Sequence, residues 1–92
     1  MRLGQYYLDF AHNVEDGYTQ AWFYADTKQE PIAEVMSVVH YKDRFSRKGW
    51  RRACLAKLLS PLYGTFAGDD LREERAQLWN EYWRVMPQDK RD

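Results

Sequence analysis

The spacing of apolar side chains changes once along this 92-residue chain, near residue 45. Before that point, apolar and other side chains alternate over residues 5–13, 18–26 and 32–41, a pattern typical of β-strands. After it, apolar residues recur every three or four positions over residues 46–60 and 69–86, as they do in helices. Because short turns separate the strands, the sequence predicts a three-stranded antiparallel meander followed by two helices packed on one face. This is an α+β domain of the β-β-β-α-α type, spanning residues 1–92.

The second predicted strand is apolar on both faces. Its aromatic residues Tyr18, Trp22 and Tyr24 alternate with Ala21, Phe23 and Ala25. Such a strand is either central and covered on both sides, or it presents one exposed aromatic face. The sequence leaves both interpretations open.

The first predicted helix carries arginine and lysine in its first two turns and Leu55, Leu58 and Leu59 on the same face further along. We therefore expect its N-terminal half to project past the core while its C-terminal half packs on the sheet. The second helix is expected to begin with a capping box formed by Asp70 and Glu73 and to end at Pro87. Residues 87–92 are predicted to form a frayed tail.

A cationic block coincides with the first helix. Six basic side chains occur there with no carboxylate between them: Arg44, Arg47, Lys48, Arg51, Arg52 and Lys57. Cations in the first turns of a helix oppose its dipole and repel one another, so a purely structural helix rarely has this arrangement. The block indicates a docking surface for phosphates or for an acidic partner, although a solvated charged face would give the same pattern.

The partner favoured by the composition is a larger protein or ribonucleoprotein complex, with possible contact to nucleic acid phosphates. The net charge is zero and the pI is about 6.7, whereas free nucleic acid binders commonly have a domain pI above about 9. Trp22, Tyr24 and Trp50 are candidate anchors, because Trp, Tyr and Arg dominate binding hot spots. By analogy of type, small aromatic-rich domains without cofactors include phage-encoded inhibitors such as anti-CRISPR proteins. We therefore expect a small inhibitor or regulator, with direct RNA or DNA binding by the same helix as the alternative.

Two partial resemblances concern the same stretch. The segment from Ser46 to Ala53, following three strands, resembles the second half of a double-stranded-RNA-binding domain, whose basic helix N-terminus spans phosphates. That family's first helix is missing here, and an acidic second helix follows. The segment from Arg47 to Leu55 also resembles the pyrophosphate loop of GCN5-type acetyltransferases, which implies coenzyme A binding. Here Arg51 occupies the position of that loop's second small residue.

Catalytic and metal-binding patterns are weak in this sequence. His12, His40 and Cys54 have no recognised metal-ligand spacing, and no Ser or Cys is placed beside a His as an activated nucleophile would be. We expect a protein that is not an enzyme and uses no cofactor or metal. A single cysteine suits a reducing cytoplasm, and no segment approaches the roughly 20 apolar residues that cross a bilayer.

Overall fold

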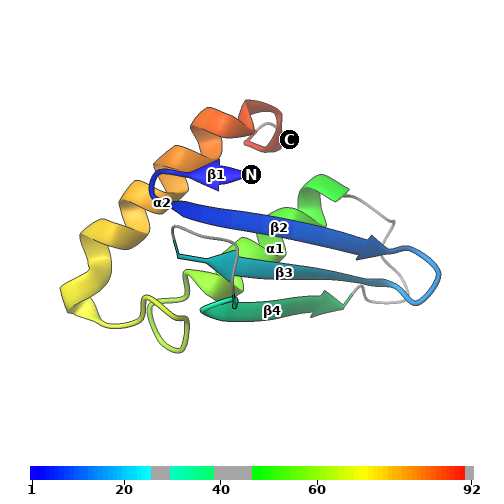
Figure 1. Cartoon of the computed structure of the whole chain (residues 1–92), viewed down its shortest axis with the longest axis horizontal. Coiled ribbons are helices and arrows are strands. Elements are labelled where there is room, and N and C mark those ends of the chain that lie inside the picture. The colour runs from blue at the N-terminus through cyan, green and yellow to red at the C-terminus, as the bar shows by residue number, and fades with distance from the viewer. Residues whose placement is uncertain (26–29, 39–46, 91–92) are drawn as a thin grey trace.

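A computed structural model describes residues 1–25, 30–38 and 47–90 of the chain. Its strands are β1 (Arg2–Leu3), β2 (Tyr6–Asn13), β3 (Tyr18–Tyr24) and β4 (Ala33–Val38), and its helices are α1 (Arg47–Leu58) and α2 (Arg72–Val85). Two short 3-10 helices, η1 (Asp69–Leu71) and η2 (Pro87–Asp89), precede and follow α2 (Figure 1). The predicted strand ends beyond residues 25 and 38, and the predicted helix start at Ser46, lie outside the described residues. The predicted α+β class is confirmed.

Within the described residues the sheet has the order β1-β2-β3-β4 with every neighbouring pair antiparallel. The sequence predicts three strands, so β1 is an addition. It forms because Gly4, at a φ of 63°, turns the chain so that Leu3 pairs with Tyr6. Leu3 is completely buried there.

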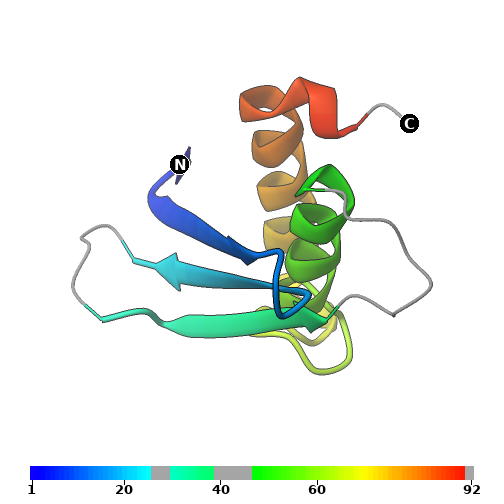
Figure 2. The ribbon, with the colours of Figure 1, turned by 90° about the vertical axis from the view of Figure 1, so that its right-hand side faces the viewer.

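The sheet has one covered face and one uncovered face among the described residues. Leu8, Thr19, Ala21 and Phe23 point to the covered face and are buried. There α1 packs against β3 and β4, and α2 packs against β1. In Figure 1 α1 passes behind the strands, and Figure 2 shows the two helices side by side. Alternation places Trp22 and Tyr24 on the opposite face, where both are half-buried. Of the two interpretations of this strand, the structure therefore favours an exposed aromatic face.

The N-terminal half of α1 does not project past the core, contrary to the expectation from the sequence. Trp50 is 7% exposed, and its ring lies 6.3 Å from the ring of His12 on β2. One turn later Cys54 is fully buried, with its thiol 3.4 Å from the carbonyl oxygen of Thr19. The core thus includes side chains from the first turns of α1 as well as from the last.

The start of α2 also differs from the prediction. Leu71 is the N-cap of α2 and no side chain caps the helix, so the expected capping box is absent. Asp69 and Asp70 instead lie in η1, and the positive φ of Gly68 leads into this turn. The predicted apolar stripe does face the core: Leu78 and Tyr82 are buried, and Trp79 and Trp83 pack beside them.

The chain after Pro87 is ordered as η2 rather than frayed as far as Asp89. Asp89 is completely buried. Residues 91 and 92 lie outside the described part. A charged side chain in a short polar tail is buried here because α1 and α2 both supply hydrogen-bond donors to it.

Candidate functional site

The first two turns of α1 bring three cationic side chains to the molecular surface. Arg47 is exposed, while Lys48 and Arg52 are half-buried. The first turn of α1, as described, contains no acidic residue. We call Arg47, Lys48 and Arg52 the cationic start of α1. Arg44, predicted to belong to the same surface, lies outside the described residues.

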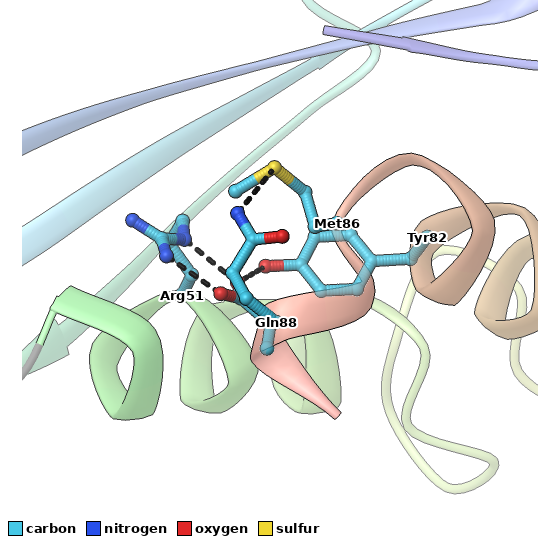
Figure 3. Close-up of polar contacts among 5 residues, drawn as sticks. Arg51, Tyr82, Met86 and Gln88 are labelled. Carbon is cyan, nitrogen blue, oxygen red and sulfur yellow. Dashed lines mark hydrogen bonds and ion pairs between the residues drawn. The ribbon is translucent and has the colours of Figure 1, made fainter. Parts of the chain in front are cut away.

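Arg51 belongs to the predicted cationic surface but points toward the C-terminal segment. Its Nε and Nη2 atoms donate to the two carboxylate oxygens of Asp89 at 2.8 and 2.7 Å. The hydroxyl of Tyr82, on α2, donates to the same carboxylate. Figure 3 shows the side chains of Arg51 and Tyr82 approaching one another from α1 and α2. The Asp89 side chain is 0% exposed and that of Arg51 is 16% exposed. The arginine that the sequence presents as a docking group is therefore engaged in an internal ion pair.

The ion pair sets the protonation states of its members. Burial raises the pKa of Asp89, but the hydrogen bonds from Arg51 and Tyr82 outweigh it, and the pKa lies below its ordinary value. The hydrogen bond to Asp89 raises the pKa of Arg51. Burial and the neighbouring carboxylate raise the pKa of Tyr82 above its usual range. At neutral pH the three groups are a guanidinium, a carboxylate and a neutral phenol.

His12, half-buried on β2, lies beside the start of α1, with its ring 6.3 Å from that of Trp50. Burial lowers the pKa of His12, and the charges of Arg51 and Arg47 lower it further. The Nδ1 atom of His12 lies 2.6 Å from the hydroxyl of Thr19. A neutral imidazole satisfied by a threonine explains this histidine without a catalytic role.

Lys57, at the far end of α1, is separated from the cationic start. Its Nζ donates to the carbonyl oxygen of Met36 on β4 at 2.6 Å. Because β4 is the last strand of the described sheet, this lysine occupies a carbonyl at a sheet edge. Charged side chains at such edges discourage pairing with strands of other molecules.

The predicted aromatic anchors do not join the cationic start in one surface. Trp50 belongs to α1, and its side chain is buried. Trp22 and Tyr24 lie on the sheet face that points away from α1. Trp22 and Tyr24 are paired across the strands with Asp9 and Tyr7, respectively. The structure thus separates a cationic surface on α1 from an aromatic surface on the uncovered sheet face.

Few of the described residues are arranged as catalytic groups or metal ligands usually are. No cluster of three or more His, Cys, Asp or Glu side chains with metal-binding potential occurs there. Burial raises the pKa of the Cys54 thiol, which disfavours the reactive thiolate. Residues 47–55, the stretch that resembles an acetyltransferase loop, lie within α1.

Searches against models of protein families, curated proteins and solved structures gave no match. Among the described residues, neither helix is both long enough and apolar enough to pass through a bilayer.

Proposed function

We propose that this protein acts by binding, as a small inhibitor or regulator that docks on a larger assembly which handles nucleic acid. The cationic start of α1 provides the docking surface, and phosphates or carboxylates on the assembly provide its counterpart. The observation that carries this proposal is the concentration of positive charge over the first turns of α1. Arg47 is exposed there, and its charge adds to burial and to the charge of Arg51 in lowering the pKa of His12.

A protein or ribonucleoprotein surface fits better than free nucleic acid. A single strand bound along α1 could not also stack on Trp22 and Tyr24, because these rings lie on the other face of the sheet. Four exposed carboxylates on η1 and the first turn of α2 would repel a long phosphate backbone: Asp69, Asp70, Glu73 and Glu74. A mixed surface with localised phosphates or carboxylates avoids that repulsion. The buried lone thiol of Cys54 suits action in a reducing cytoplasm.

The decisive experiment is a pull-down from bacterial lysate with matched charge variants. Arg47→Gln/Lys48→Gln removes two charges from the cationic start of α1. Arg72→Gln/Arg84→Gln removes two charges from exposed positions on α2 and serves as the control. Arg51 is left intact because its loss would disturb the ion pair with Asp89.

Each protein is tested with and without nuclease treatment. The proposal predicts an assembly that wild type and the control retain after nuclease and that Arg47→Gln/Lys48→Gln loses. Retention that disappears with nuclease for wild type would identify direct nucleic acid binding instead. Equal retention by both double variants after nuclease would refute docking through α1.

A further inference from the structure

The uncovered sheet face carries a row of three side chains with distinctive chemistry. Asp9 on β2 pairs with Trp22 on β3, and Trp22 pairs with Glu34 on β4. Residues directly opposite on antiparallel strands have Cβ atoms about 4.5–5.5 Å apart and point to the same face. Trp22 therefore has a carboxylate on each side. We call these three residues the Asp9–Trp22–Glu34 row.

The two carboxylates of the row disfavour binding of nucleic acid at Trp22 and favour binding of a cation. A base stacked on Trp22 would bring its phosphates close to two carboxylates. In contrast, the face of an indole ring attracts cations more strongly than that of any other side chain. Carboxylates beside the ring add to that attraction. A guanidinium group suits both features, because it stacks on aromatic faces and pairs with carboxylates through two parallel hydrogen bonds.

In the neighbouring cross-strand row of the same face, a guanidinium already lies over an aromatic ring. The Arg2 guanidinium lies 5.7 Å from the centroid of the Tyr7 ring. The Met1 ammonium lies 3.7 Å from Asp9 Oδ1 and compensates part of that charge. Glu34 accepts a hydrogen bond from the neutral amide of Gln20, so its negative charge is not cancelled by that contact.

Apolar side chains border the row on the β4 side. Met36 and Val38 are 43% and 68% exposed and point to the same face as Glu34. The aliphatic stem of an arginine, or an apolar neighbour in its chain, would find a surface to cover there. The face thus combines an aromatic ring, two acids and an apolar border.

We propose that the Asp9–Trp22–Glu34 row is a docking site for an arginine side chain on a partner protein. The guanidinium stacks on the Trp22 indole and pairs with the flanking carboxylates, Glu34 first. This inference goes beyond the proposed function, since it concerns a different face and the opposite charge. It holds or fails independently of docking by α1.

The test titrates wild-type protein with a blocked peptide containing one arginine flanked by glycines, followed by NMR. The same peptide with citrulline, which keeps the shape but lacks the charge, is the matched ligand control. We expect the arginine peptide to shift the Trp22 indole N–H and the Asp9 and Glu34 amide signals, and to bind at least about tenfold more tightly than the citrulline peptide. Equal binding of both peptides, or an unmoved Trp22 indole signal at millimolar arginine peptide, overturns the proposal.

Protein variants locate the site. Asp9→Asn/Glu34→Gln keeps both shapes and should weaken arginine binding at least about tenfold, because the charge attraction is lost. Glu73→Gln/Glu74→Gln neutralises two exposed carboxylates on α2 and should bind as wild type does. Undiminished binding by Asp9→Asn/Glu34→Gln overturns the proposal. Since the citrulline comparison uses wild-type protein, it decides the question even if a variant fails to fold.

Discussion

Replacing Asp89 by alanine should strongly destabilise this domain, although only three residues follow it in the chain. The substitution removes the acceptor for two hydrogen bonds from Arg51 and one from Tyr82. Breaking a buried ion pair costs roughly 3–5 kcal/mol, because the remaining charge is left without its partner. Since Arg51 retains 16% exposure, water can reach the stranded guanidinium. We therefore expect the free energy of unfolding to fall by about 3 kcal/mol, near the lower end of that range.

The assay is urea unfolding followed by tryptophan fluorescence. For a domain of this size a loss of about 3 kcal/mol corresponds to a midpoint shift of about 2 M in urea, or roughly 12–24 °C in Tm. Arg84→Gln, which breaks the exposed pair between Arg84 and Glu81, is the control and should leave the midpoint unchanged. An Asp89→Ala midpoint equal to that of wild type would refute the assignment of Asp89 as a structural acid.

The same ion pair predicts a direction of pH dependence. The pKa of Asp89 is lower in the folded protein than in the unfolded chain, where a free aspartate titrates near about 3.9. Its stabilising contribution is therefore complete above that value and is lost as the pH falls through it toward the folded pKa. The difference in unfolding free energy between wild type and Asp89→Asn should narrow as the pH falls below about 4. A difference that stays constant would contradict the ionic nature of the contact.

Two further predictions concern other parts of the fold. Removing the Arg47 charge should raise the pKa of His12 in an NMR titration, because that charge helps to lower it; an unchanged or lower pKa would show that Arg47 contributes no positive potential there. Gly64→Ala should destabilise the protein by about 1–3 kcal/mol through overpacking, since a Cβ at this position would overlap the carbonyl oxygen of Leu58 and lie 2.7 Å from the amide nitrogen of Ser60. Thermal unfolding measures this effect, and an unchanged Tm would show that the loop after α1 can relax.

Much of the architecture follows from periodicity. The alternation predicted over residues 5–13 is present in β2, where Leu8 is buried on the covered face and Tyr7 and Asp9 lie on the other face. The helical spacing likewise found the buried face of α2. β1 was missed because two residues, Arg2 and Leu3, are too few for a periodic signal, and the turn at Gly4 is its only mark.

The site was harder to predict because its key contacts join distant segments. Arg51 and Asp89 are 38 positions apart, and an aspartate after Pro87 looks like a solvated tail residue. Likewise, Asp9, Trp22 and Glu34 form a row only once the register of three strands is known. A linear count of charges could therefore locate the basic helix but could not divide its arginines between surface and interior.

The most direct test of docking through α1 starts from the partner that wild-type protein retains after nuclease treatment. Its dissociation constant is measured, at one salt concentration, for wild type and for each of the two double charge variants. We expect Arg47→Gln/Lys48→Gln to raise Kd at least about tenfold, a loss of about 1.4 kcal/mol, and Arg72→Gln/Arg84→Gln to leave it unchanged. Equal Kd values for both variants would contradict docking through the cationic start of α1.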